Sequence, residues 1–157
     1  MKKIITLGQV QNLIKQLKQE AKTIVLAGGC FDILHQGHLR FLEAAKKHGD
    51  ILIIALESDE NVKRLKGQER PINKESLRAK NLIRTGFVDY VIILPTLKTA
   101  TNYLNLVKTL IPDIIAVTAG DSQIANKKRQ AETVGGKVKV VINRLPSFST
   151  SKIIKKS

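Results

Sequence analysis

The fold is most evident in the segment Thr23-Ile24-Val25-Leu26-Ala27-Gly28-Gly29-Cys30-Phe31-Asp32-Ile33-Leu34-His35-Gln36-Gly37-His38. Its first five residues form a short, nearly continuous apolar run, which is typical of a strand covered on both faces in a parallel sheet. Two glycines end that run, and a helical pattern extends from Gly37 to about His48. A strand, a glycine turn and a helix in this order predict one unit of an α/β fold.

Similar apolar runs recur along the chain, and helical patterns separate them. Strands are expected at residues 23–27, 51–56, 90–94, 114–117 and 138–142, and helices at about 37–48, 74–85, 100–110 and 122–133. Strands that alternate with helices are joined by right-handed crossovers. The sequence therefore predicts a Rossmann-like α/β fold, an open parallel five-stranded sheet with helices on both faces. One domain is expected over 1–157, with an N-terminal amphipathic helix (1–22) before the α/β core (23–154).

Composition narrows the class of protein. The 157 residues include 27 Lys and Arg against 13 Asp and Glu, a net charge of +14, and 43% hydrophobic residues, as in a globular domain. A single cysteine excludes an intramolecular disulfide framework and fits a reducing compartment. The longest apolar runs fall far short of the roughly 20 residues that span a bilayer. We therefore expect a cytoplasmic protein with no membrane partner.

The glycine turn and the two histidines after it predict an anion site. In open parallel sheets, ligands bind beyond the carboxyl ends of the strands, where the strand order reverses. Gly28 and Gly29 allow the backbone to approach a ligand, and the following helix start offers free N–H groups to an anion. His35 and His38 are three residues apart and suit hydrogen-bond donation to phosphate oxygens. The alternatives are a histidine pair that satisfies backbone groups or two zinc ligands, but His48 is the only other histidine, which disfavours structural zinc.

The His-x-Gly-His motif resembles that of the nucleotidyltransferases related to cytidylyltransferases. The longer segment from Phe31 to Ala45 is similar to the adenylyltransferase domain of bifunctional ADP-heptose synthases. The resemblance covers about residues 23–154. Its further motifs are Gly49-Asp50, Ser58-Asp59, Leu65-Lys66-Gly67, Arg70-Pro71-Ile72-Asn73, Arg78-Ala79, Val88-Asp89-Tyr90-Val91 and, near the end, Arg144 with Ser149-Thr150-Ser151-Lys152-Ile153, a signature that glycerol-3-phosphate cytidylyltransferases share.

The resemblance implies attack by an acceptor phosphate on the α-phosphorus of a nucleoside triphosphate, with release of pyrophosphate. His35 and His38 would hold the triphosphate, Lys66 would reach it from the loop after the second strand, and Arg144 would bind the β- and γ-phosphates. Magnesium (Mg²⁺) would be held mainly by the triphosphate, so no protein metal site is expected. The residues expected to contact the nucleotide are Gly28, Gly29, Cys30, Phe31, Gly37, Asp121, Ser149, Thr150 and Ser151.

Several of these residues also have purely structural interpretations. Asp121 either contacts the nucleotide or caps a helix. Asp59 either binds the acceptor or caps the next helix, and Arg78 either contacts acceptor phosphate or pairs with Glu75. Two further residues are assigned structural roles only: Asp32 fixes its loop by accepting backbone hydrogen bonds, and His48 interacts with a helix C-terminus. The thiol of Cys30 is expected to pack and not to react.

The substrate pair follows less directly from the sequence. The segments Leu65–Gly67 and Arg70–Asn73 favour transfer from ATP to a sugar phosphate that resembles heptose 1-phosphate. Departures from the heptose family at Ala119–Ser122 and Ser147-Phe148 affect loops that bear on substrate. The alternatives are a CTP-dependent glycerol-3-phosphate-type cytidylyltransferase, an FMN adenylyltransferase, or a basic module that binds nucleotide or nucleic acid without turnover. Six aromatic residues argue against a base-stacking platform, and we expect a homodimer that binds no nucleic acid.

Overall fold

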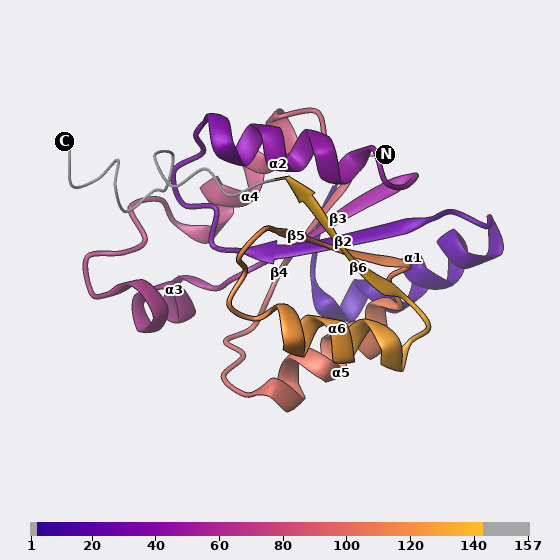
Figure 1. Cartoon of the computed structure of the whole chain (residues 1–157). Coiled ribbons are helices and arrows are strands. Elements are labelled where there is room, and N and C mark those ends of the chain that lie inside the picture. The colour runs from indigo at the N-terminus through magenta and orange to yellow at the C-terminus, as the bar shows by residue number, and fades with distance from the viewer. Residues whose placement is uncertain (1–2, 143–157) are drawn as a thin grey trace.

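The computed structural model describes residues 3–142, which form a single parallel sheet between two helical layers (Figure 1). The sheet has six strands in the order β1-β4-β3-β2-β5-β6. The elements are β1 (Lys3–Ile5), α1 (Leu7–Gln19), β2 (Ile24–Gly29), α2 (Gln36–Lys46), β3 (Ile51–Leu56), α3 (Asp59–Lys66), α4 (Glu75–Arg84), β4 (Tyr90–Ile93), α5 (Ala100–Leu110), β5 (Ile114–Thr118), α6 (Ile124–Thr133) and β6 (Lys137–Ile142).

The order of the strands reverses at β2, and this reversal indicates where a ligand site is expected. From β2 the chain continues to β3 and β4 on one side, and then returns to add β5 and β6 on the other. β2 pairs with β3 over its whole length and with β5 at Val25 and Leu26. The carboxyl ends of β2 and β5 therefore diverge around the loop that carries the two histidines, where ligands bind in sheets of this kind.

Two apolar cores cover the faces of the sheet, which confirms the predicted helices on both faces. Alternate strand residues point to opposite sides. Leu26 and Ile53 pack with α1, α5 and α6 on one face, whereas Val25 and Leu52 pack with α2 and α4 on the other (Figure 1). None of the helices within residues 3–142 has the length and apolarity needed to cross a membrane.

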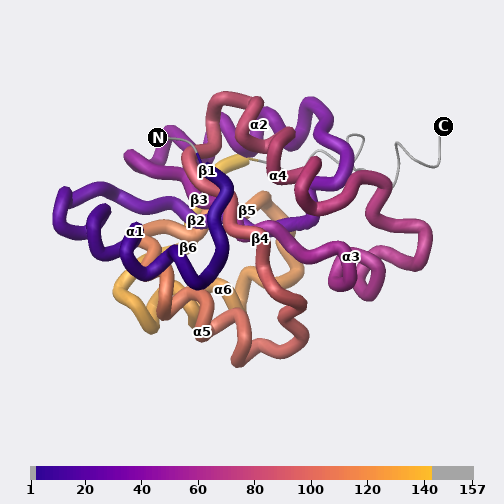
Figure 2. Tube along the Cα trace, turned by 180° about the vertical axis from the view of Figure 1, so that it is seen from behind, coloured from indigo at the N-terminus to yellow at the C-terminus, as the bar shows by residue number. Residues whose placement is uncertain are grey.

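The sheet has one strand more than the five predicted. β1 pairs in parallel with β4, Lys3 opposite Tyr90, and forms an edge of the sheet (Figure 2). This strand has only three residues, and two of them are exposed. It therefore lacks the apolar run by which the buried strands are recognised.

A short helix, α3, occupies the connection after β3 that was expected to be a loop. Lys66 is its last residue, so the predicted loop position of Lys66 is wrong. Ser58, not Asp59, is the N-cap of this helix, and the Ser58 hydroxyl accepts a hydrogen bond from the Asn61 amide at 3.1 Å. Six of the eight residues of α3 are charged or polar with few apolar anchors, which hides the helical period in the sequence.

Candidate active site

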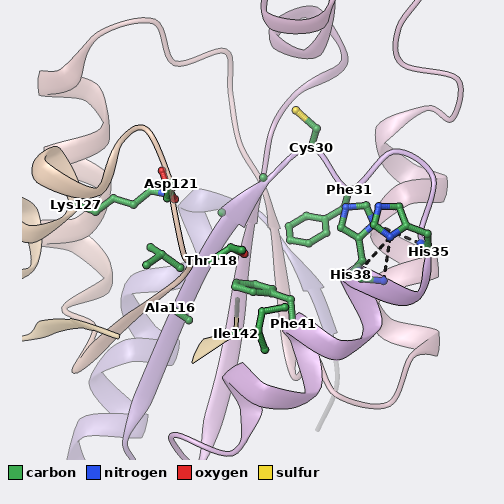
Figure 3. A pocket seen from close by; sticks show the side chains of 14 residues that line it. Cys30, Phe31, His35, His38, Phe41, Ala116, Thr118, Asp121, Lys127 and Ile142 are labelled. Atoms are coloured by element: carbon green, nitrogen blue, oxygen red, sulfur yellow. Dashed lines mark hydrogen bonds and ion pairs between the residues drawn. The ribbon is translucent and has the colours of Figure 1, made fainter. Parts of the chain in front are cut away.

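A cavity of about 290 Å³ lies at the carboxyl ends of β2 and β5, and we call it the histidine cavity. Figure 3 shows His35 and His38 on one side of it and Asp121 with Lys127 on the other. Six of the residues that were expected to contact nucleotide line it together with the two histidines. Its lining residues are Gly28, Gly29, Cys30, Phe31, His35, Gly37, His38, Phe41, Ala116, Val117, Thr118, Asp121, Lys127 and Ile142.

The end of β2 fits closely around the ring of Phe31. A Cβ atom on Gly29 would lie 2.9 Å from that ring, so only glycine fits there without a shift. Phe31 has a φ of 45°, in the left-handed region that costs a non-glycine residue energy. Its ring is buried and lies 5.4 Å from the His38 ring, centroid to centroid. The turn therefore places an apolar wall beside the imidazoles.

His35 and His38 are fixed by the backbone of the helix start. His35 is the N-cap of α2, and its Nδ1 accepts hydrogen bonds from the Gly37 amide at 3.0 Å and the His38 amide at 3.4 Å. His38 Nδ1 accepts from the His35 amide at 3.4 Å. The two rings stack with centroids 3.9 Å apart. The predicted alternative, in which the pair satisfies backbone groups, is thus correct for the Nδ1 atoms.

This arrangement decides the protonation of the pair. Because Nδ1 of His35 is an acceptor, the neutral ring carries its proton on Nε2. Burial lowers the pKa of His35, and burial together with the adjacent His35 lowers the pKa of His38 to about 4, against a smaller opposing effect of a hydrogen bond with the Ile33 backbone. At neutral pH both rings are therefore uncharged in the free protein, and they can offer a ligand N–H groups without a full charge.

Asp121 closes the opposite side of the histidine cavity. Its Oδ1 accepts a hydrogen bond from the Gln123 amide at 2.7 Å, and its Oδ2 lies 2.6 Å from the Lys127 ammonium. The formal N-cap of α6 is Gln123, so Asp121 holds the turn before the helix rather than capping it. The same carboxylate lines the cavity, which leaves its predicted contact with nucleotide open to test.

Asp32 accepts backbone hydrogen bonds, as the sequence predicts, but from the loop before α4 and not from its own loop. It is buried and accepts from the Ile72 amide at 2.7 Å and the Asn73 amide at 2.8 Å. Arg70 adds an ion pair at 2.8 Å. Burial by itself disfavours the charged form, but these hydrogen bonds and the Arg70 charge outweigh it and lower the pKa of Asp32.

Arg78 joins the same loop to α3 from inside the protein. Its side chain is fully buried and donates to the Cys30 carbonyl at 2.7 Å, the Asn73 carbonyl at 3.0 Å and Asp59 Oδ1 at 2.8 Å. The predicted alternative pairing with Glu75 is wrong, because Glu75 instead accepts a hydrogen bond from the Asp59 amide. Contact of Asp59 and Arg78 with an acceptor stays a prediction.

The positive charge of Lys66 acts on Cys30 across the edge of the site. Burial raises the pKa of the Cys30 thiol, and the positive charge of Lys66 partly opposes that rise. The exposed Lys66 at the end of α3 thus lies near the loop that carries the histidines, although it does not line the histidine cavity. The raised pKa agrees with a packing role for Cys30. His48 is exposed in the turn after α2 and does not line that cavity.

The remaining predicted site residues, Arg144, Ser149, Thr150 and Ser151, lie outside the described residues. Conversely, six residues that line the histidine cavity were not predicted as site residues. They are Phe41, Ala116, Val117, Thr118, Lys127 and Ile142. Lys127 belongs to a run of three basic residues (127–129), and the others look like ordinary helix or strand positions. These residues come together at the strand ends because of the order of the strands in the sheet. Their local sequence carries no signal that identifies them as site residues.

Comparison with known sequences gives a consistent result. The sequence profile of the cytidylyltransferase-like family matches residues 26–156. The chain is 43% identical over 146 residues to the bifunctional protein HldE of Campylobacter jejuni subsp. jejuni serotype O:6, a match that covers 93% of this chain and 30% of that protein. It is 39% identical over 156 residues to HldE of Actinobacillus succinogenes, covering 98% of this chain and 31% of that protein. The chain thus spans less than a third of the length of these relatives.

Solved structures share the fold. The lipopolysaccharide core biosynthesis protein from Thermoplasma volcanium GSS1 matches with a TM-score of 0.62 and 26% identity, over 79% of this chain and 97% of that one. Pantoate-beta-alanine ligase from Francisella tularensis, solved with beta-gamma ATP and beta-alanine, matches with a TM-score of 0.73 over 100% of this chain and 74% of that one. At 16% identity, this second likeness concerns the fold alone.

Proposed function

The chain belongs to the cytidylyltransferase-like family, and from this we propose that it transfers a nucleoside monophosphate from ATP to a sugar phosphate, releasing pyrophosphate. The family resemblance predicted from the motifs is thereby confirmed. The observation that carries the proposal is the histidine cavity, in which two neutral imidazoles from one helix start face Asp121 and Lys127 at the switch point of the sheet. The similarity to HldE supports a heptose 1-phosphate as the acceptor.

The reaction needs few groups from the protein. An acceptor phosphate oxygen, already ionised at neutral pH, forms a bond to the α-phosphorus. The bond from that phosphorus to the bridging oxygen breaks, and pyrophosphate leaves with the electron pair. No general base is needed, so the protein positions the reactants and stabilises the developing charge.

The described residues suit that task. His35 and His38 would donate N–H groups to phosphate oxygens, and their low pKa means that they bind without repelling the cations around the site. An approaching triphosphate would raise both pKa values, because a negative charge favours the protonated imidazole. Lys66 would neutralise charge from the edge of the site. Beyond the described residues, Arg144 with Ser149 and Thr150 would bind the β- and γ-phosphates, and Ser151 would also contact the nucleotide.

Magnesium fits this site as an ion bound by the triphosphate. Asp121 is the carboxylate that lines the histidine cavity, and both of its oxygens already accept hydrogen bonds, from Gln123 and Lys127. In the proposal, phosphate oxygens therefore supply most of the ligands of Mg²⁺. The bound ion would neutralise charge on the leaving pyrophosphate.

The experiment is a matrix of donors and acceptors. The full chain is incubated with each of ATP, CTP, GTP and UTP and with heptose 1-phosphate, mannose 1-phosphate, glycerol 3-phosphate or FMN, and pyrophosphate and the coupled product are measured. We expect the highest kcat/KM for ATP with heptose 1-phosphate. Preference for CTP with glycerol 3-phosphate, or for FMN, would replace the proposed substrates by the alternative ones. Nucleotide binding without pyrophosphate from any pair would make the chain a binding module.

The predicted homodimer and cytoplasmic location stay predictions. Size-exclusion chromatography with light scattering measures the first, and fractionation of cells that express the chain measures the second. The predicted lack of nucleic-acid binding is tested by retention on RNA and DNA over a range of salt concentrations, because phosphate contacts make such binding strongly salt-dependent.

A further inference from the structure

A second cavity of about 480 Å³ adjoins the histidine cavity on the other side of the end of β2. We call it the α5–α6 cavity, because α5 and α6 supply much of its wall. It shares Gly28, Gly29 and Lys127 with the histidine cavity, so the two meet at the strand end. Its size is within the range of about 300–1,000 Å³ that small-molecule sites occupy.

The α5–α6 cavity combines an apolar floor with polar side chains. Leu26, Ala55 and Ile115 from the strands lie at its base. The polar residues around it can accept and donate hydrogen bonds, and just one of them is acidic. They are Glu57, Arg64, Lys98, Thr99, Tyr103, Gln123, Asn126, Lys127 and Gln130.

Glu57 is held in a fixed position at this cavity. Its backbone amide donates to the Gly29 carbonyl at 3.1 Å, which places it directly beside the end of β2. Its Oε2 accepts from the Tyr103 hydroxyl at 2.8 Å, and its Oε1 accepts from Asn61 Nδ2 at 2.9 Å. Asn61 is fully buried and also donates to the Leu97 carbonyl at 3.1 Å. Two neighbours therefore orient a half-buried carboxylate before any ligand arrives.

A carboxylate held in this way retains capacity for a ligand. Its two oxygens offer about four lone-pair sites, and the Tyr103 hydroxyl has one proton to donate. Burial and the hydrogen bond to Glu57 raise the pKa of Tyr103 to about 12, so the hydroxyl stays protonated and keeps donating across the physiological range. The remaining lone pairs of the Glu57 carboxylate are best suited to accept hydrogen bonds from hydroxyl groups, because O–H to carboxylate hydrogen bonds are short and strong.

We propose that Glu57, oriented by Tyr103 and Asn61, binds hydroxyl groups of the sugar phosphate acceptor in the α5–α6 cavity and determines specificity for a polyhydroxylated acceptor. The inference rests on the proposed function and adds to it the residue that recognises the sugar hydroxyl groups. The acceptor phosphate lies away from Glu57, at the shared strand end near Lys127, because two anions repel each other. That places the nucleophile at the boundary between the two cavities.

The test compares Glu57→Gln with the wild type in the full chain. Glutamine keeps the size of the side chain and one oxygen, which can accept from Tyr103 or from Asn61, while the charged acceptor is lost. Circular dichroism measures whether the fold is preserved. We expect the KM for heptose 1-phosphate to rise at least about tenfold, the loss of one charge-assisted hydrogen bond, with no change in the KM for ATP. Tyr103→Phe should raise the same KM by a smaller factor, since it frees the carboxylate to rotate.

Deoxygenated acceptors separate recognition from structure. Among monodeoxy analogues of heptose 1-phosphate, at least one should be a much poorer acceptor than the parent for the wild type and nearly equal to the parent for Glu57→Gln. If Glu57 had only a structural role, the ratio of activity with the parent acceptor to activity with the deoxy analogue would be the same in the wild type and in Glu57→Gln. The matched control is Glu60→Gln, at an exposed acidic residue in the first turn of α3 that lines neither cavity, and it should leave both KM values unchanged.

Direct binding of heptose 1-phosphate, measured by calorimetry with a non-hydrolysable ATP analogue present, distinguishes the two proposals. If product forms and Glu57→Gln has wild-type KM values and selectivity, the assignment of Glu57 is wrong and the proposed function stands. If the acceptor binds more weakly to Glu57→Gln but the wild type forms no product, the proposed function is wrong and the assignment stands. If the wild type neither binds the acceptor nor forms product, both are wrong.

Discussion

Arg70 and Asp32 form an ion pair inside the protein, with Arg70 Nε 2.8 Å from Asp32 Oδ2 and both side chains less than a tenth exposed. The pair joins the loop that leads to His35 with the loop that precedes α4. Asp32 also accepts the backbone amides of Ile72 and Asn73, so one carboxylate organises both loops. The histidine cavity thus depends on a contact between residues 38 positions apart.

Asp32→Asn should destabilise the protein, because it leaves the Arg70 guanidinium buried without its counter-charge. We expect a loss of about 3 kcal/mol in the free energy of unfolding, measured by urea denaturation. Lys18→Gln removes a far more exposed ion pair with Asp113 and should cost less than about 1 kcal/mol. Equal losses in the two variants would show that the buried pair has no special structural role.

Removal of the imidazole at either motif position should lower turnover at least about 100-fold, the usual effect of losing one preorganised donor. His38→Ala tests one ring. His35→Asn tests the other and keeps an acceptor at the N-cap of α2, so the helix start survives. Activity is read as pyrophosphate release, and folding by circular dichroism. His48→Ala is the control, since this exposed ring should leave turnover unchanged. Full activity of a folded His38→Ala protein would contradict the phosphate-donor role.

Stability should fall as the pH drops from about 6.5 to about 4. In the folded chain the pKa of His38 is lowered from 6.5 to about 4, so within this window the unfolded chain binds a proton that the folded chain does not. The free energy of unfolding therefore decreases with falling pH, by at most about 3 kcal/mol from this group.

The same pH series on two variants assigns this loss. His38→Gln should reduce the pH dependence of the free energy of unfolding between pH 6.5 and 4 and leave the part that comes from His35, whose pKa is also lowered from 6.5, whereas His48→Gln should keep all of it. Asp32, whose pKa is lowered from 3.8, contributes stability that is lost only in more acidic solution, so the two effects separate. An unchanged slope in His38→Gln would mean that His38 is not buried as a neutral ring.

The thiol of Cys30 reports the position of Lys66. Because the chain has a single cysteine, its reaction with a thiol reagent can be followed without interference. The ammonium of Lys66 lowers the pKa of the Cys30 thiol, so Lys66→Met should raise that pKa and slow the reaction at a fixed pH. Lys63→Met, on the same helix, changes an equal charge and should have a smaller effect. If Lys63→Met slowed the reaction more than Lys66→Met, Lys66 would not lie near Cys30 and the site.

Arg144 is expected to distinguish triphosphates from monophosphates. If it binds the β- and γ-phosphates, as its family motif implies, Arg144→Ala should weaken ATP binding by about 1.5–3 kcal/mol. AMP binding should barely change, and calorimetry can measure both. Equal losses for the two nucleotides would assign Arg144 a general electrostatic effect.

Local patterns in the sequence were enough to predict the repeating units of the fold. The buried strands read as unbroken apolar runs because helices cover both of their faces, and the histidine motif is recognisable because its residues are contiguous. The edge strand β1 and the polar helix α3 escaped prediction for the converse reason. Each buries few side chains, so burial leaves little periodic signal in its sequence.

The amino-acid sequence was sufficient to predict the α/β architecture, the family and the position of His35 and His38 at a helix start, since each depends on neighbours within one or two elements. Which residues face the two histidines became visible in the folded chain. The pairing of Asp121 with Lys127, the burial of Arg78 against the Cys30 carbonyl and the position of Glu57 beside Tyr103 join residues from separate units. Such contacts depend on the strand order, because crossovers bring distant strand ends to one edge of the sheet, and strand order leaves no mark on the local sequence.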